Sequence, residues 1–337
     1  MAGLSDRNGA RLRTLARLVR EGRRILLLTH EYPDGDAFGS MVGLGLAISS
    51  PDRRVTMFCA GGPPALFKFL PGAAEVRDDP GRTEDYDLAV MLDCHRLERV
   101  GGPAEALRRL RTLAALDHHL ADELLPENVL VATEASSTGE LVFYLINELG
   151  VTLTREVAAN LFAAISTDTG SFCFENTSAE SLEIAARLVR AGVSPWEVFR
   201  GLSLGRPRGR LALLGLALSG LEYYHQGRLG VMTLTQENLA ATGVGWDDAD
   251  GFVEYPRSVQ GVELAVLFRS IGPESCQVSL RSLGRINAAA LARMFGGGGH
   301  SQAAGFTANG RLSDLKAKVI EASAAFMPPL EARGAEW

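Results

Sequence analysis

The sequence predicts an α/β protein with two domains, and three observations support this. Short apolar runs alternate with longer segments of helical periodicity, which is typical of parallel sheets flanked by helices. The 337 residues exceed the length of one ordinary core. A stretch rich in Gly, Pro and Arg follows residue 200 and separates the two parts. We therefore expect an N-terminal domain over 1–200 with a parallel sheet, a linker over 201–220, and a smaller α/β domain with a mixed sheet over 221–337.

The elements of the first domain follow from two kinds of pattern. Continuous apolar runs bounded by charged or turn residues predict buried strands over 25–28, 55–59, 88–92 and 113–116. Apolar residues at helical spacing predict helices over 10–22, 37–49, 136–150, 154–165 and 178–193. The helix over 136–150 opens with a capping-box pattern and stops at Gly150.

The second domain is expected to follow a short apolar helix that ends near residue 218. A hairpin is predicted for 221–224 and 229–234, with a turn between its strands. Further strands are predicted over 263–268 and 277–280, and a helix over 287–294. Four glycines and a histidine then follow at 296–300.

The first strand runs into a turn that carries His30, Asp34 and Asp36 within seven positions. Pro33 and Gly35 force a tight turn there, so the three side chains can point into one space. Carboxylate oxygens with an imidazole suit Mn²⁺, Mg²⁺ or Zn²⁺ better than thiophilic metals. The alternative is an ordinary Asx-rich turn between a strand and a helix.

Two more predicted strands also end in acidic or imidazole groups. Asp93 follows one of them, and Asp117, His118 and His119 follow the next. Because the carboxyl ends of parallel strands line one crevice, these groups are expected to meet there. For Asp93 alone, a helix N-cap is the competing interpretation. Asp168 falls at the C-terminal turn of a predicted helix, where a carboxylate opposes the helix dipole unless a cation lies beside it.

The glycine run at 296–299 leaves a main chain whose N–H groups can approach an anion closely. His300 adds a directed donor, and Arg281 at the end of the preceding strand could make a charge-assisted contact with the same anion. The alternative is a flexible turn, since glycine runs are common in loops.

Composition excludes several classes of protein. The net charge of -6 argues against tracking long nucleic acid, although a local basic pocket for a short anion remains compatible with it. No apolar run approaches the roughly 20 residues that cross a bilayer, and charges interrupt the N-terminal segment, unlike a signal peptide. We expect a cytoplasmic protein with no membrane partner. Its cysteines contain no CxxC pair, which disfavours a thiolate zinc site or a disulfide framework; they are Cys59, Cys94, Cys173 and Cys276.

Together, these motifs resemble those of the DHH phosphoesterase superfamily with its DHH-associated C-terminal domain, over nearly the whole chain. Any one motif is weak, but all of them in this order are specific. Within the superfamily the chain looks most like bacterial enzymes that degrade very short RNAs and dephosphorylate 3′-phosphoadenosine 5′-phosphate. The motifs are His30-x-x-x-Asp34-x-Asp36, Asp93, Asp117-His118-His119, Asp168 and the run 296–300.

The resemblance implies two Mn²⁺ ions, with Mg²⁺ or Co²⁺ as alternatives. It implies that the first ion is held by His30, Asp34 and Asp93, and the second by Asp36, Asp93, His118 and Asp168, with Asp93 bridging. Asp117 would orient its neighbours from behind, and His119 would lie beside the substrate phosphate. The second domain would clamp the substrate through Arg281, Gly297, Gly298, Gly299 and His300.

The function expected from this resemblance is hydrolysis of a phosphoester by two metal ions, which activate water and neutralise phosphoryl charge. His119 is the preferred group for protonating the leaving group, with His300 as the alternative. The chain departs from close relatives at Cys173 and at Cys94-His95, which bears on substrate preference. Alternatives are a phosphodiesterase for cyclic or linear di-adenylate, a pyrophosphatase or exopolyphosphatase, and a binding regulator without catalysis. The oligomeric state stays open, with a homodimer among the possibilities.

Overall fold

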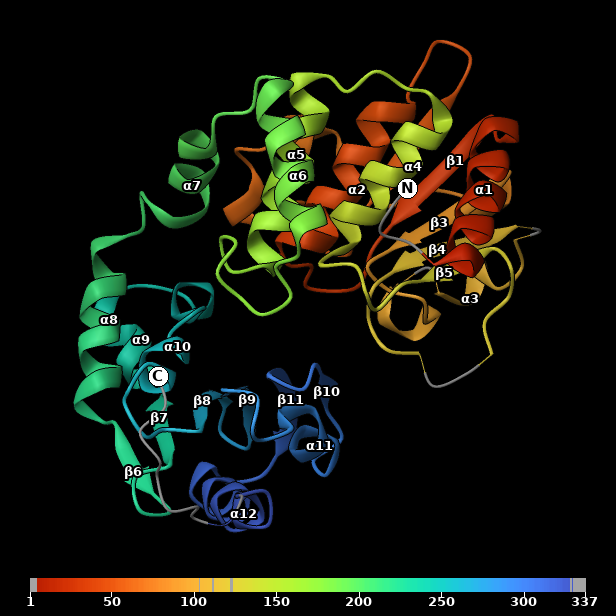
Figure 1. The fold of residues 1–337 in the computed structure, drawn as a ribbon. Coiled ribbons are helices and arrows are strands. Elements are labelled where there is room, and N and C mark those ends of the chain that lie inside the picture. The colour runs from red at the N-terminus through yellow and green to blue at the C-terminus, as the bar shows by residue number, and fades with distance from the viewer. Residues whose placement is uncertain (1–4, 103, 111, 122–123, 328, 330–337) are drawn as a thin grey trace. The chain divides into compact units, whose positions relative to one another are not determined.

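The structure is a computed structural model that describes residues 5–102, 104–110, 112–121, 124–327 and 329. The chain forms two compact units, Met1–Gly205 and Arg206–Trp337. Figure 1 shows the first unit from red to green and the second from green to blue. Each unit has its own sheet and its own core, so each is described by itself.

The first unit contains a five-stranded parallel sheet in the order β2-β1-β3-β4-β5. Its strands are β1 (Arg24–Leu28), β2 (Arg54–Phe58), β3 (Leu88–Leu92), β4 (Leu113–Asp117) and β5 (Val129–Val131). Since the chain enters every strand from the same side, all carboxyl ends lie at one edge of this sheet. The predicted fold class, an α/β unit with a parallel sheet, is confirmed.

Helices cover this sheet unequally on its two faces. They are α1 (Asp6–Glu21), α2 (Gly35–Ile48), α3 (Ala104–Leu107), α4 (Thr138–Leu149), α5 (Arg155–Asp168), α6 (Ala179–Arg190) and α7 (Pro195–Ser203). Helical 3-10 turns occur at Ala65–Phe67, Ala73–Glu75, Thr83–Asp85 and Leu97–Arg99. The larger core joins residues of α1, α2, α4, α5 and α6 with strand residues such as Leu27 and Val90. Figure 1 shows α2, α4, α5 and α6 grouped beside one another. A smaller core covers the other face around Leu26, Met91 and Val100.

Helices α2 and α5 approach each other closely because α2 carries glycines at the contact. A Cβ built on Gly39 would meet the carbonyl oxygen of Asn160 at 2.6 Å, so a larger residue would push the helices apart. Helix α2 begins where the Asp34 carboxylate accepts a hydrogen bond from the Ala37 amide at 3.0 Å. The close packing brings the start of α2 near the end of α5.

The second unit has a six-stranded mixed sheet in the order β10-β11-β9-β8-β7-β6. Strands β7 and β8 are parallel, and the other neighbouring strands are antiparallel. The bounds are β6 (Glu222–Tyr224), β7 (Leu229–Leu234), β8 (Leu264–Gly272), β9 (Ser275–Ser282), β10 (Gly298–Gly299) and β11 (Ala303–Asn309). The predicted mixed sheet in the second part of the chain is therefore confirmed.

Helices of the second unit form two small cores on opposite faces of its sheet. Leu264 and Val278 pack on one face with α11 and α12, and Leu267 packs on the other face with α8 and α9. The helices are α8 (Arg208–Ser219), α9 (Gln236–Thr242), α10 (Glu254–Arg257), α11 (Ala288–Arg293) and α12 (Leu312–Ala324), with a 3-10 turn at Trp246–Ala249.

The structure also contains elements that the sequence patterns did not predict. Helices α7, α9, α10 and α12 and strand β5 are among them, because most are short or carry few apolar residues. The division between the two units falls inside the segment 201–220. That segment is mostly helical, since α7 ends at Ser203 and α8 begins at Arg208. Among the described residues, no helix combines the length and the apolar character needed to cross a membrane.

Candidate metal centre

Acidic and imidazole side chains gather at the carboxyl edge of the parallel sheet. They are delivered by five elements: the ends of β1, β3 and β4, the start of α2, and the last residue of α5. Three groups of donors form there, each with ligand atoms within 4.8 Å of one another. The groups are His30 with Asp34 and Asp93, Asp36 with His118 and Asp168, and Asp93 with Asp117 and His119.

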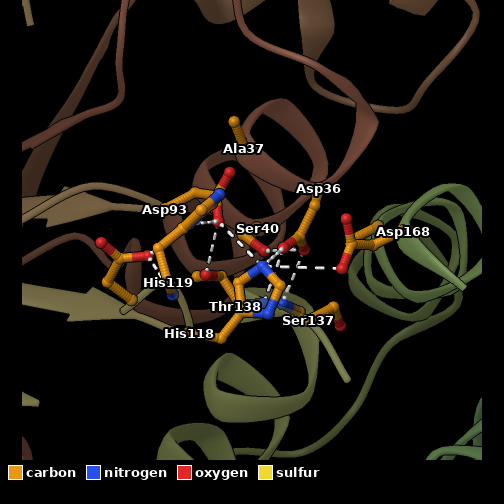
Figure 2. A network of polar contacts seen from close by, with 12 residues as sticks. Asp36, Ala37, Ser40, Asp93, His118, His119, Ser137, Thr138 and Asp168 are labelled. Carbon is orange, nitrogen blue, oxygen red and sulfur yellow. Dashed lines mark hydrogen bonds and ion pairs between the residues drawn. The ribbon is translucent and has the colours of Figure 1, made fainter. Parts of the chain in front are cut away.

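His118 lies at the centre of the second group, as Figure 2 shows. Its Nε2 atom is 3.7 Å from Asp36 Oδ2, 3.6 Å from Asp93 Oδ1 and 3.5 Å from Asp168 Oδ2. Two donor atoms that each lie about 2.1 Å from one ion at a tetrahedral angle are ~3.4 Å apart. These distances therefore fit ligands around one cation. Asp93 lies at the same spacing from His118 as Asp36 and Asp168 do, so it fits the same set.

His30 and Asp93 are arranged in the same way in the first group. The His30 ring donates from Nδ1 to the carbonyl oxygen of Glu31 at 2.8 Å, which leaves Nε2 as the atom with a lone pair. That Nε2 lies 3.6 Å from Asp93 Oδ2. Asp93 Oδ2 is buried and accepts no hydrogen bond from any residue that the structure describes. A cation at that position would give this buried carboxylate oxygen the partner that it lacks among the described residues.

Asp93 adopts a left-handed backbone conformation, with φ of 60°. Such values are uncommon outside glycine and are often found at functional sites, where the surrounding structure enforces them. Its amide donates to the carbonyl of Leu116 at 2.9 Å, which ties the end of β3 to β4. No helix begins at Asp93 in the described chain, so the alternative interpretation as a helix N-cap is wrong.

Two of the acidic groups, Asp36 and Asp168, have raised pKa values because they are buried beside other carboxylates. Burial, followed by the charges of Asp93 and Asp168, raises the pKa of Asp36 well above its usual value. Burial raises the pKa of Asp168 to about 7, and the negative charges of Asp34 and Asp93 add to this. Divalent cations would remove this repulsion, because they favour the ionised carboxylates.

Asp117 holds two imidazoles from behind the cluster. His119 donates from Nδ1 to Asp117 Oδ1 at 2.8 Å and from its backbone amide at 3.0 Å, while His95 Nδ1 lies 2.5 Å from Asp117 Oδ2. Burial opposes ionisation, but these hydrogen bonds hold the pKa of Asp117 far below its usual range. Burial likewise opposes the charged imidazole, but Asp117 and Asp93 raise the pKa of His119 to about 9. His119 is therefore oriented with its Nε2 edge directed away from Asp117.

The sequence analysis missed the donors that hold the acidic ligands in place. At the start of α4, the amides of Thr138 and Gly139 donate to Asp36 at 2.6 and 2.8 Å, and the Thr138 hydroxyl donates to Asp93 at 2.8 Å (Figure 2). The capping-box pattern had located this helix start, but a local pattern says nothing about which distant carboxylate the amides meet. His95 was noted only as a departure from relatives, and its contact with Asp117 was not predicted.

The predicted glycine run belongs to the second unit and is more ordered than a flexible turn. The Gly297 amide donates to Ala292 at 3.0 Å and the His300 amide donates to Ala303 at 2.7 Å, so both serve the fold. A Cβ on Gly297 would meet the carbonyl oxygen of Gly305 at 2.2 Å, whereas one on Gly298 would meet nothing within 4 Å. Close backbone packing therefore explains the glycine at 297, while Gly298 stays open to a ligand.

Arg281 belongs to the same unit and lies near the end of β9. Its Nε donates to Glu254 at 3.0 Å and its guanidinium also donates to the Leu280 carbonyl at 3.0 Å. An anion bound by Arg281 would therefore compete with Glu254. At the two positions where the resemblance implies other residues, Cys94 is buried in the smaller core and Cys173 is exposed.

Comparisons with known proteins show which families and relatives this chain resembles. Residues 24–165 match the DHH family, N-terminal domain, and residues 231–326 match the DHHA1 domain. The chain is 34% identical over 300 residues to the bifunctional oligoribonuclease and PAP phosphatase NrnA of Thermus thermophilus, covering 88% of each chain. It is 28% identical to the protein of the same name from Bacillus subtilis, covering 83% of this chain and 88% of that one.

A solved structure has the same fold over nearly its full length. It is an exopolyphosphatase-related protein from Bacteroides fragilis, with 27% identity and a TM-score of 0.85. The superposition covers 94% of this chain and 97% of that one, so it includes both sheets described above.

Proposed function

Because the chain belongs to the DHH family and carries a DHHA1 domain, we propose that it hydrolyses phosphoester bonds in short oligoribonucleotides and in 3′-phosphoadenosine 5′-phosphate. Both substrates would yield nucleoside monophosphates. The observation that carries the proposal is the set of donor groups around buried Asp93, which joins ligands from five elements at one edge of the sheet. The names of the two similar NrnA proteins support the choice of substrates.

The donors fit a pair of divalent cations. His30, Asp34 and Asp93 would hold the first, and Asp36, His118 and Asp168 the second, with Asp93 shared between them. The donor-free oxygen of Asp93 and the spacing around His118 support this assignment. One imidazole and several carboxylates per ion suit Mn²⁺, with Mg²⁺ or Co²⁺ as alternatives. When bound, such a pair would lower the pKa of a water molecule and neutralise charge on the phosphoryl oxygens.

The protein's own residues would do the remaining work. Asp117 holds His119 through Nδ1, so the Nε2–H of a protonated His119 can donate to a phosphoryl or leaving-group oxygen. In the protein without cations, the hydrogen bond to Asp117 and the charge of Asp93 raise the pKa of His119 to about 9 against the effect of burial, which favours the protonated ring. On the second unit, Arg281, His300 and the main chain at 297–299 would bind the rest of an anionic substrate.

Turnover of a substrate panel by the full chain tests this proposal. The panel contains 3′-phosphoadenosine 5′-phosphate, a short oligoribonucleotide, cyclic di-adenylate and pyrophosphate, each with Mn²⁺, Mg²⁺ or Co²⁺. We expect the first two to be hydrolysed best with Mn²⁺, with kcat/KM at least ~10-fold above the others. Hydrolysis of pyrophosphate alone, or no hydrolysis with any metal, would overturn the proposal. Cyclic di-adenylate as the best substrate would instead support the alternative phosphodiesterase.

A further inference from the structure

The first turn of α4 contacts acidic side chains that come from two other elements. The Thr138 amide donates to Asp36 Oδ2 at 2.6 Å, and the Gly139 amide donates to Asp36 Oδ1 at 2.8 Å. The Thr138 hydroxyl donates to Asp93 Oδ1 at 2.8 Å. Thr138 is fully buried, so these contacts exclude water (Figure 2). A single residue therefore touches one carboxylate from α2 and one from the end of β3.

The amide contacts alone have a simple explanation in helix capping. The first N–H groups of a helix have no partner within the helix, and a carboxylate can accept hydrogen bonds from them. Its negative charge also interacts favourably with the positive N-terminal end of the helix dipole. Ser137 is the N-cap, and its hydroxyl accepts from the Glu140 amide at 3.2 Å. Capping of α4 therefore explains the two amide hydrogen bonds to Asp36, but it does not explain the hydrogen bond from the Thr138 hydroxyl to Asp93.

The hydroxyl contact acts on Asp93 in a different way. It occupies one lone pair of Oδ1, while Oδ2 accepts no hydrogen bond from the described residues. The hydrogen bond therefore fixes the rotation of the carboxylate about its Cβ–Cγ bond and determines which lone pairs remain for a cation. Because the Thr138 amide also holds Asp36, the orientations of the two carboxylates are linked through one rigid helix start.

We infer that Thr138 is a positioning residue that orients Asp93 between two cations and fixes Asp36 beside one of them. This role presupposes the paired cations of the proposed function. Partners that orient a ligand from behind typically change metal affinity or activity by about 10–100-fold when removed. The hydroxyl, rather than the size of the side chain, carries this role.

Three variants and two measurements test the role of the hydroxyl. Thr138→Val keeps the shape and the backbone amide but removes the hydroxyl, Thr138→Ser keeps the hydroxyl, and Thr56→Val makes the same change at a buried threonine of β2. Mn²⁺ binding to metal-free protein is measured by calorimetry. Electron paramagnetic resonance then reports the magnetic coupling of two Mn²⁺ ions that share a carboxylate.

We expect wild type, Thr138→Ser and Thr56→Val to bind two coupled Mn²⁺ ions. Thr138→Val should bind the second ion at least ~10-fold more weakly, or lose the coupling, and kcat should fall ~10–100-fold with KM changed less than about threefold. Thr138→Ala removes the same hydroxyl without added volume and replaces the valine variant if that variant does not fold.

If wild type binds two coupled Mn²⁺ ions and the hydroxyl-free variants keep the same Mn²⁺ affinity and magnetic coupling, the role inferred for Thr138 is refuted. The proposed function is not affected by that outcome. Failure of Thr138→Ser to restore the coupling would also overturn the role of Thr138. Failure of wild type to bind two coupled ions would instead refute the proposed function.

Discussion

Asp93 is the residue on which the candidate metal centre depends most. It is buried, and its two oxygens face histidines from β1 and β4, with distances of 3.6 Å to both His30 Nε2 and His118 Nε2. Burial alone would raise its pKa, but His30, His119 and His118 outweigh this and lower it. Asp93 is therefore expected to be ionised at neutral pH, which its proposed role as a shared ligand requires.

Replacing Asp93 with alanine is expected to remove cation binding and turnover together, because the ligand common to both ions is lost. Metal analysis of the purified variant should find fewer than two ions per chain, and kcat/KM should fall at least ~1,000-fold. Asp87→Ala is the matched control, since among the described residues the Asp87 carboxylate accepts from the amides of Arg23 and Arg24 alone. Two tightly held ions in Asp93→Ala would contradict the bridging role.

His300 is expected to act on the substrate rather than on the cations. His300→Ala should raise KM by about 10-fold, the effect of losing one hydrogen bond to a charged group, while both ions stay bound. Steady-state kinetics with 3′-phosphoadenosine 5′-phosphate and metal analysis measure this. His225→Ala is the control, because the His225 ring is hydrogen-bonded to Ile320 and Ser323 of its own unit. Loss of metal from His300→Ala would disprove the substrate-clamp assignment.

At the scale of elements, glycines decide how closely backbones approach around both candidate sites. A Cβ on Gly139 at the start of α4 would meet the Ala164 side chain of α5 at 2.7 Å. In the second unit, β11 lies against the glycine run, and Gly299 has a φ of 130° that other residues rarely adopt. A larger residue at Gly139 or Gly299 would therefore disturb the fold itself, so its effect on activity could not be separated from its effect on stability.

Gly297 and Gly298 provide a matched pair for separating packing from substrate binding. Gly297→Ala should destabilise the protein by about 1–3 kcal/mol, because its Cβ would meet backbone at 2.2 Å. Gly298→Ala should fold normally, since nothing lies within 4 Å, but should raise KM if the main chain there binds substrate. Thermal unfolding and KM measure the two effects. Equal stability of both variants would refute the packing explanation, and an unchanged KM in Gly298→Ala would remove Gly298 from the substrate site.

At the scale of the whole molecule, stability is expected to depend on how the acidic cluster is neutralised. Asp36 and Asp168 both have raised pKa values, so their ionised forms are disfavoured in the folded protein without cations. Protons or divalent cations can relieve this, and the two compete for the same oxygens. The sign of the pH dependence should therefore differ between metal-free and metal-loaded protein.

The metal-free protein is expected to lose stability as pH rises from 5 to 9. The pKa of Asp168 is raised from 3.8 to about 7, so the folded state binds more protons than the unfolded state between these values and stability falls as pH rises. The pKa of His119 is raised from 6.5 to about 9, so its contribution is present below 6.5 and lost through 9. Both groups act in the same direction.

Thermal unfolding of metal-free protein should show a midpoint lower by about 4 °C or more at pH 8.5 than at pH 5.5. Saturating Mn²⁺ should reverse the trend, because cations bind the deprotonated ligands. A metal-free midpoint that rises across this range would show that these groups do not control stability.

Local sequence patterns were enough to predict an α/β protein with two parts, together with most of its strands and long helices. Apolar runs and helical periodicity depend on which side chains are buried, and that information is local. The parallel sheet also follows from local patterns, and it predicts one edge at which strand ends such as Asp93 and Asp117 would meet. The motifs at His30–Asp36 and at 117–119 therefore predict residues of the candidate site from local sequence alone.

The hydrogen bonds that orient those residues could be identified only from the tertiary structure. The donors to Asp36 and Asp93 come from Thr138 and Gly139, more than 40 positions away from Asp93 in the chain, and His95 reaches Asp117 from the segment that follows β3. Such contacts depend on how helices and strands pack, and no periodicity encodes a hydrogen bond between distant elements. The packing role of Gly297 could likewise be recognised only in the folded chain, because it depends on how closely the backbone of Gly305 approaches.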